Sequence, residues 1–141
     1  MPELPEVART VLNLNQSMKG EILEDVIVHS GRYAKHGDPA GLGGFREDLP
    51  AKIENITFQG KLIIFEFTSY CSGKKWWAWN TLGMGGGWRN DKVKHSHVEF
   101  RTKSGSVFFT DIRNFGTLKF TDDTEETDKK KRTIGPNHLN D

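Results

Sequence analysis

The 141-residue sequence has a single cysteine, Cys71, and it lacks any long apolar run. One cysteine excludes an internal disulfide and a zinc site built from cysteines, so we expect an intracellular protein of a reducing compartment, either cytoplasm and nucleoid or nucleus. No segment has the length and apolarity of a membrane span, and the N-terminus lacks the pattern of a signal peptide. We therefore expect no membrane partner.

Net charge is also small, at +1, which by itself gives little reason to expect a polyanionic partner. The charges are unevenly distributed, however. The stretch TDDTEETD at 121–128 carries five acidic residues and no basic ones, and without it the chain has a net charge of +6. An acidic block of this kind is typical of a solvated linker, and a moderately basic body is compatible with nucleic-acid binding.

Helical spacing of apolar residues is clearest near the N-terminus, where four residues would share one face: Val7, Val11, Leu14 and Met18. Pro5 suits the first turn of such a helix, because its missing N–H would have no partner there. Gly20 is placed to end it. We therefore predict an amphipathic helix that begins near Pro5.

From Gly20 onward the pattern changes to short strands separated by glycine-rich turns, which indicates a mainly β fold, either a sandwich or a flattened barrel. In KLIIFEF at 61–67, alternation places Ile63, Phe65 and Phe67 on one face and Leu62, Ile64 and Glu66 on the other. The stretch at 31–48 is predicted to be a loop.

The residues PELPEV at 2–7 form the first candidate site. Removal of the initiator methionine would expose Pro2 as a secondary amine, which loses its proton more readily than a lysine and is nucleophilic at neutral pH. Glu3 and Glu6 lie beside this amine and could transfer protons. Carboxylates in the first turn of a helix also stabilise it through attraction to the helix dipole. On spacing alone, this structural role is commoner than a role in proton transfer.

Lys61 and Met84 are further candidates. Lys61 opens an apolar strand directly after Gly60, where it could reach a phosphate or simply lie at the surface. Met84 stands among four glycines in LGMGGGW, either exposed for contact or buried in the core.

The motif DIRNFG at 111–116 places Arg113 and Phe115 two residues apart, on one face of an extended backbone. An aromatic ring can wedge between bases, and a guanidinium can fill an emptied pairing position. A turn with a buried phenylalanine is the alternative interpretation.

Together and in this order, these segments resemble the formamidopyrimidine-DNA glycosylase and endonuclease VIII family over nearly the whole chain. The resemblance is carried by PELPEV, GK before an apolar strand, LGM-GG-W, HVEF, DIRNFG and IGPNHLND. It implies an N-terminal catalytic domain at 1–120, folded as a two-layered β-sandwich of about eight strands flanked by an N-terminal helix. A charged linker at 121–141 would lead to the family's second half, a helix–two-turn–helix domain with a zinc finger or a zincless equivalent, which these residues do not include.

In that family the N-terminal proline attacks C1′ of a damaged nucleoside and expels the base, and the resulting Schiff base undergoes β- and δ-elimination. The resemblance therefore implies a bifunctional DNA glycosylase and AP lyase of base excision repair. It assigns Pro2 as the nucleophile, Glu3 as the proton-handling carboxylate and Glu6 as a supporting group. It also assigns Lys61 to a phosphate that flanks the lesion.

The same resemblance assigns Met84, Arg113 and Phe115 to the space left when the base is everted. The implied partner is double-stranded DNA that contains oxidised bases or abasic sites, bound by a monomer. No cofactor or metal is implied for this chain, because any zinc finger would lie in the second half. SGRY and WNT look more like the endonuclease VIII branch, whereas PELPEV and Met84 favour the other, so the choice between oxidised purine and pyrimidine stays open.

Three alternatives remain at this point. The first is a damaged-DNA-binding domain of the same fold, which would bind DNA without catalysing base removal. The missing second half favours it, because a chain without that half would be expected to turn over poorly. A tautomerase also uses an N-terminal proline, but its chain begins with a strand rather than a helix. An unrelated β-sandwich interaction domain would require six ordered motifs to match by coincidence.

Overall fold

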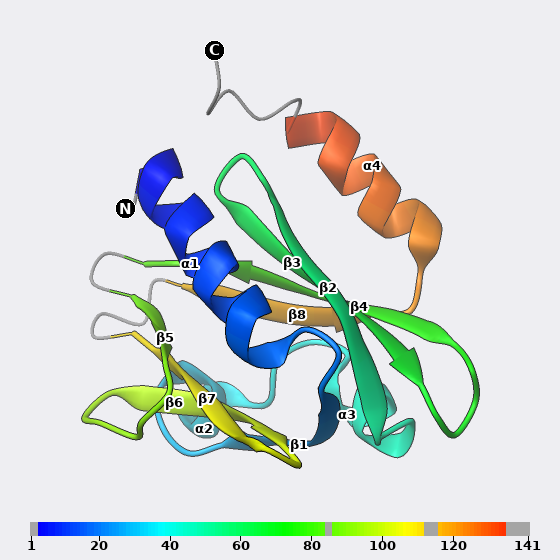
Figure 1. Cartoon of the computed structure of the whole chain (residues 1–141), viewed down its shortest axis with the longest axis horizontal. Coiled ribbons are helices and arrows are strands. Elements are labelled where there is room, and N and C mark those ends of the chain that lie inside the picture. Colours follow the sequence, from blue (N-terminus) through cyan, green and yellow to red (C-terminus); the bar gives the residue numbers. More distant parts are fainter. Residues whose placement is uncertain (1–2, 84–85, 112–115, 135–141) are drawn as a thin grey trace.

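The computed structural model describes residues 3–83, 86–111 and 116–134, which form four helices and eight strands (Figure 1). The helices are α1 (Leu4–Met18), α2 (Arg32–His36), α3 (Leu42–Glu47) and α4 (Thr124–Ile134). The strands are β1 (Ile22–Val28), β2 (Ala51–Gln59), β3 (Leu62–Ser69), β4 (Lys75–Thr81), β5 (Gly87–Arg89), β6 (Ser96–Thr102), β7 (Gly105–Thr110) and β8 (Thr117–Thr121). Within the described ranges, no helix combines the length and the apolarity that crossing a bilayer requires.

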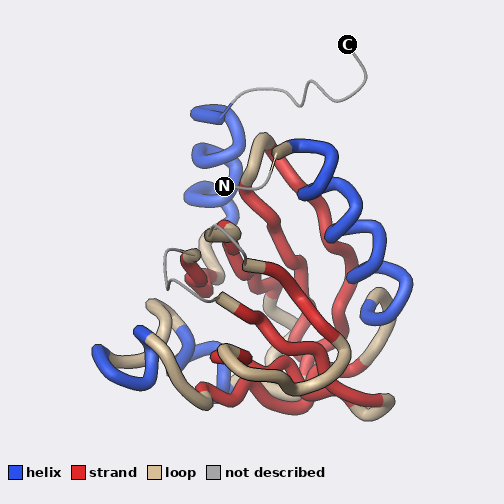
Figure 2. Tube along the Cα trace, turned by 90° about the vertical axis from the view of Figure 1, so that its left-hand side faces the viewer, coloured by secondary structure: helices blue, strands red, loops and turns tan. Residues whose placement is uncertain are grey.

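The strands of the described residues pair antiparallel in one sheet of order β5-β7-β6-β1-β2-β3-β4-β8. The sheet folds over at β1, which pairs with β2 only at Ile22 and Leu23 and then, after a bulge, follows β6 as far as Val28. Two layers result, one containing β2, β3 and β4 and the other β5, β6 and β7 (Figures 1 and 2). The predicted two-layered β-sandwich with an N-terminal helix is confirmed.

Aromatic rings from both layers meet in the core. The ring of Phe65 on β3 lies 5.3 Å from that of Phe100 on β6, and the ring of Trp88 on β5 lies 4.9 Å from the same Phe100. Phe65 and Phe100 have no exposed surface. Because such large side chains remove much apolar area from water and also attract each other edge to face, this cluster holds the two layers together.

Strand β3 is buried on both faces, with the alternation predicted from its sequence. Ile63, Phe65 and Phe67 lie in the core between the layers. Leu62 and Ile64 lie on the opposite face, in a smaller apolar cluster against which Ile134 packs. A helix therefore covers the outer face of this layer.

That helix, α4, falls within the segment for which the sequence suggested a charged linker. The side chain of Asp123 accepts a hydrogen bond from the N–H of Glu126 (3.2 Å), which caps the first turn. Acidic residues follow in the first turn and basic residues lie in the last, as the helix dipole favours. Thr127 is buried and accepts a hydrogen bond from Nε1 of Trp79 (3.2 Å), which ties α4 to β4.

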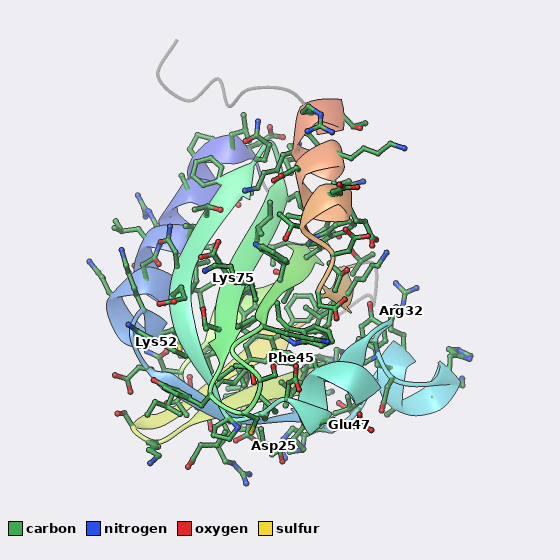
Figure 3. All side chains as sticks on the ribbon, turned by 90° about the vertical axis from the view of Figure 1, so that its right-hand side faces the viewer. Asp25, Arg32, Phe45, Glu47, Lys52 and Lys75 are labelled. Carbon is green, nitrogen blue, oxygen red and sulfur yellow. The ribbon has the colours of Figure 1, made fainter. Side chains whose placement is uncertain are left out.

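The prediction of a loop over 31–48 is wrong, because α2 and α3 occupy much of this stretch. Phe45 of α3, labelled in Figure 3, has no exposed surface. Its ring lies 4.9 Å from those of both Phe67 and Phe120. Gly41 precedes α3 with a φ of +80°, and a side chain there would meet the carbonyl oxygen of Phe120 at 1.9 Å. Burial of Phe45, rather than local propensity, stabilises this short helix.

The predicted amphipathic helix is confirmed as α1, with four buried residues: Val7, Val11, Leu14 and Met18. Asn15 fixes α1 lengthwise on β2. Its Nδ2 donates to the carbonyl of Ile56 (2.7 Å), and its Oδ1 accepts from the N–H of Ile56 (3.1 Å). Strand β1 pairs with β2 only at Lys52 and Ala51. At Ile56, the side-chain amide of Asn15 therefore makes the backbone hydrogen bonds that a neighbouring strand would otherwise make.

Glu99 on β6 gives the structure a predicted acid sensitivity. Burial raises the pKa of this carboxyl group, but hydrogen bonds with Ser106, His29 and Arg101 outweigh it, so that the net pKa lies below the ordinary value. A carboxyl group whose pKa is lowered by folding stabilises the fold above its unfolded pKa and loses that contribution as pH falls through its folded pKa.

We expect Glu99→Gln to lower the free energy of unfolding at neutral pH by about 1–3 kcal/mol, because it removes a charged acceptor from donors that stay in place. The difference from wild type should shrink as the pH falls below ~4. Urea unfolding across this pH range measures both effects. Glu47→Gln, an exposed residue of α3, is the matched control. An equal loss at neutral and acid pH would contradict the role of the Glu99 charge.

Candidate active site

The first turn of α1 holds two of the predicted site residues. The carbonyl of Glu3 accepts hydrogen bonds from the N–H groups of Glu6 and Val7 (both 3.0 Å), so Glu3 is the N-cap residue of the helix. Its side chain makes no capping hydrogen bond, and its carboxylate is therefore free to point elsewhere. Glu6 is exposed in the first turn, where a negative charge interacts favourably with the helix dipole.

Lys61 lies at the tip of the β2–β3 hairpin and reaches this helix end. Its Nζ is 3.7 Å from Oε2 of Glu3, and the two side chains are 40% and 74% exposed. An ion pair so accessible to water contributes little to stability, at most about 1 kcal/mol. Neither group is committed to holding the fold, so both remain available to a ligand.

The hairpin tip is held by packing from the far end of the chain. Gly60 has a φ of +56°, and a side chain there would meet Cγ2 of Ile134 at 2.7 Å. The turn therefore requires glycine both for its backbone conformation and for its contact with α4. In this way α1, the β2–β3 hairpin and α4 meet at one end of the molecule (Figure 1).

The structure brings together three of the predicted residues and leaves four outside its description. Glu3 and Lys61 form an ion pair, and Glu6 lies one turn along the same helix end. The other four, Pro2, Met84, Arg113 and Phe115, lie outside the described residues. Pro2 is bonded directly to Glu3, so the predicted nucleophile is the immediate neighbour of the paired carboxylate.

The residues that flank the undescribed segments lie beside one another. The N–H of Gly86 donates to the carbonyl of Gly83 (2.8 Å), across residues 84–85. The N–H of Gly116 donates to Oδ2 of Asp111 (2.8 Å), across residues 112–115. A side chain at Gly116 would meet the carbonyl oxygen of Thr81, the last residue of β4, at 2.7 Å. Figure 1 places the end of β4 and the start of β8 on the side of the sandwich where α1 begins.

A hollow whose lining includes two cationic side chains adjoins this edge. Its lining includes Gly86, Arg89, Lys94, His95 and Thr110. Arg89 and Lys94 are exposed, as a surface that meets a polyanion requires. None of these residues is among those predicted from the sequence, although the alternating lysines of KVKHSH at 92–97 were a visible signal.

A metal site is not evident in the described ranges, where no three His, Cys, Asp or Glu side chains are grouped closely enough to bind an ion. The described side chains at the helix end supply carboxylates and an amine. Glu3 can accept or donate a proton, and Lys61 can offset negative charge. The site is open, as a large substrate would require.

Comparison with known proteins identifies the family. Residues 1–118 match the family model of the formamidopyrimidine-DNA glycosylase N-terminal domain. The chain is 35% identical over 133 residues to the formamidopyrimidine-DNA glycosylase of Bacillus cereus, covering 89% of this chain and 45% of that protein. The enzyme of the same name from Pediococcus pentosaceus is 31% identical over 139 residues, with 96% and 49% covered. The chain thus spans about half the length of these curated relatives.

Solved structures share the fold. A complex of Lactococcus lactis Fpg with DNA containing an abasic site superposes with a TM-score of 0.76 at 23% identity, over 94% of this chain and 48% of that one. The MutM (Fpg) protein of Thermus thermophilus gives 0.71 at 23% identity, over 90% and 43%. With a family model matched over 118 residues and a sandwich of the same architecture, this chain belongs to the formamidopyrimidine-DNA glycosylase family, of which it contains the N-terminal domain.

Proposed function

We propose that this chain carries the catalytic end of a bifunctional DNA glycosylase and AP lyase of base excision repair, which removes oxidised bases from double-stranded DNA. The observation that carries the proposal is the pairing of Lys61 with Glu3 at the start of α1, directly beside Pro2. Family membership supports the same activity, since the curated relatives are named as formamidopyrimidine-DNA glycosylases.

The chemistry begins when removal of Met1 leaves Pro2 as a secondary amine. Its nitrogen forms a bond to C1′ of the damaged nucleoside as the bond from C1′ to the base breaks. The base leaves with that electron pair and gains a proton, while the amine gives one up. The nitrogen lone pair then forms a double bond to C1′ as the bond from C1′ to O4′ breaks, and O4′ leaves with that electron pair and takes up a proton. The product is an iminium ion, which is the Schiff base.

The iminium ion acts as an electron sink for two eliminations. Loss of a proton from C2′ breaks the bond from C3′ to its phosphate oxygen, and loss of a proton from C4′ breaks the bond from C5′ to the other phosphate oxygen. Each leaving phosphate carries the electron pair of the broken bond. Hydrolysis of the remaining iminium ion restores the amine of Pro2. Both strand cuts therefore follow from one covalent intermediate.

The described side chains fit the proton and charge transfers that these steps need. Glu3 is exposed and adjacent to the amine, so it can move protons between Pro2, the sugar and the base. Lys61 can pair with a phosphate that flanks the lesion in place of Glu3. Glu6 adds negative charge at the same helix end. No metal or organic cofactor takes part in this scheme.

The edge of the sandwich that adjoins the site would bind DNA. The protein would do so as a monomer. Its described part carries the hollow whose lining includes the cations Arg89 and Lys94 together with His95. The segments that lead from this edge contain Met84, Arg113 and Phe115, to which we assign the filling of the space left by the everted base. A solved relative is described as a complex with abasic-site DNA, which supports the same class of partner.

A second candidate function is a damaged-DNA-binding domain without catalysis. It is favoured by one observation, that the chain spans about half the length of its curated relatives. If the phosphate contacts needed for turnover reside mainly in the other half of those relatives, this chain would bind DNA and react poorly.

Borohydride trapping on a duplex with a single abasic site separates the two. Borohydride reduces an iminium ion to a stable amine, so the proposed enzyme should become covalently linked to the DNA. The control is the same chain with one extra residue ahead of Pro2, which turns the amine into an unreactive amide. Intact mass must verify the N-terminus of both proteins. An adduct formed equally by the blocked chain, or by neither chain, would contradict catalysis by Pro2.

A further inference from the structure

Asn15 joins helix α1 to one residue of strand β2 through both ends of its side-chain amide. Its Nδ2 donates to the carbonyl of Ile56 (2.7 Å), and its Oδ1 accepts from the N–H of the same residue (3.1 Å). The hydroxyls of Thr10 and Ser17, also on α1, bond to carbonyls within the helix itself. Asn15 therefore links the body of the helix to the sheet at a defined position.

The apolar face of α1 attracts the helix to the sheet without such a defined position. Val7, Val11 and Leu14 are buried, and the free energy gained by removing them from water does not depend on direction. A hydrogen bond is directional and weakens steeply when its groups are misaligned. Two of them on the same residue, Ile56, therefore resist sliding of α1 along β2.

The chain that follows α1 is also paired with β2. The N–H of Gly20 donates to the carbonyl of Ile53 (2.7 Å), and the N–H of Ile53 donates to the carbonyl of Glu21 (2.9 Å). These bonds lie beyond Lys19, the C-cap residue, whose backbone has left the helical conformation. They limit how far the helix can move, but the contact made from within the helix is that of Asn15.

Comparable distances along the helix and along the strand bring Glu3 and Lys61 to the same level. Helix α1 and strand β2 run in opposite directions, so both lead from the contact of Asn15 to this ion pair (Figure 1). A rise of 1.5 Å per residue places Glu3 about 18 Å from Asn15 along the helix. Strand β2 ends at Gln59, about 10 Å beyond Ile56, and the turn and the lysine side chain account for the rest.

Small movements of α1 matter at this site. Moving the helix by one residue along β2 would displace Glu3 by about 1.5 Å. The Nζ of Lys61 is 3.7 Å from Oε2 of Glu3, and a displacement of about 1 Å at reacting groups can slow a reaction ~10²-fold. We propose that Asn15 is a positioning residue for base removal, because it sets the level of Glu3 relative to Lys61. The inference rests on the proposed function and adds to it a residue at the other end of α1.

The test measures base removal in single turnovers, on a duplex with one oxidised base, over a range of protein concentrations. It gives a maximal rate and the protein concentration at half of that rate. We expect Asn15→Leu, which is similar in shape but has no hydrogen-bonding group, to lower the maximal rate about tenfold. The loss is limited because Gly20 still pairs with Ile53. The half-saturating concentration should stay within about twofold, because Lys61 keeps its place on the hairpin.

Asn13→Leu makes the same change at an exposed residue of α1 and should keep the wild-type rate within about twofold. A double-mutant cycle separates positioning from stability. In chains that already carry Lys61→Ala, Asn15→Leu should slow the maximal rate less than about threefold, because the partner of Glu3 is absent. A role in stability alone lowers the thermal midpoint and leaves the maximal rate of the folded protein unchanged, and that result would overturn the inference.

The same loss with and without Lys61 would overturn it too, since Asn15 would then not act through the ion pair. If Asn15→Leu fails to fold, Asn15→Asp replaces it, because aspartate keeps the acceptor for the N–H of Ile56 and loses the donor to its carbonyl. A wild-type maximal rate in Asn15→Asp would then overturn the inference. A wild-type chain that removes no base would contradict the proposed function, and the inference with it.

Discussion

Glu3→Gln should slow single-turnover base removal by about 10²–10⁴-fold, the range in which a positioned proton-transfer group contributes. Glutamine has nearly the same shape but cannot accept or release a proton, so the proposed nucleophile, Pro2, would lose its proton carrier. The ion pair with Lys61 would also be lost, but both partners are exposed and its contribution to stability is small. The rate measured on a duplex with one oxidised base reports this effect.

Glu24→Gln is the matched control, because it makes the same chemical change at an exposed residue of β1. It should leave the rate within about twofold of wild type. Urea unfolding of both variants should give free energies close to that of wild type, which separates a chemical effect from a loss of fold. A Glu3→Gln chain that excises the base at the wild-type rate would remove Glu3 from the mechanism.

Phe45→Ala should have the largest effect on stability, lowering the free energy of unfolding by about 3–5 kcal/mol. Phe45 is fully buried, and its ring lies among those of Phe67, Trp76 and Phe120, at 4.9, 5.4 and 4.9 Å. Removing the ring leaves a cavity that a rigid sheet cannot close. Since Phe45 is also the main anchor of α3, this short helix should lose its attachment to the sheet.

Urea denaturation followed by tryptophan fluorescence measures this loss. Tyr70→Ala is the control, since it removes a similar ring that is 57% exposed, and it should change stability by no more than about 0.5 kcal/mol. A cost of less than about 1 kcal/mol for Phe45→Ala would mean that the α3 segment does not belong to the core.

Elements with a regular repeat were predicted well. In α1, the residues expected on one face are the buried ones, and Pro5 lies in the first turn. In β3, Phe65 faces the core and Ile64 faces the outer cluster, as alternation required. Such patterns are local, because a helix or a strand repeats its orientation every few residues whatever it packs against.

Elements whose order depends on distant partners were missed. The stretch at 31–48 was predicted to be a loop because it is rich in glycine. A helix forms around Phe45 because its ring packs against rings from β3, β4 and β8. Helix α4 was not predicted, because its many charged residues are also typical of a solvated linker. Its capping aspartate, Asp123, with Glu126 three residues later, was a signal that could have revealed it.

The sequence by itself determined the family and predicted the chemistry, because PELPEV, DIRNFG and the glycine-rich turns are motifs whose residue types and order can be recognised without coordinates. Only the tertiary structure decided how distant residues combine. Lys61 reaches Glu3 because Asn15 fixes α1 along β2 and Ile134 packs on the hairpin tip. Asp111 meets Gly116, which is held in turn by Arg32. Contacts of this kind join residues far apart in the chain, and no local repeat encodes them.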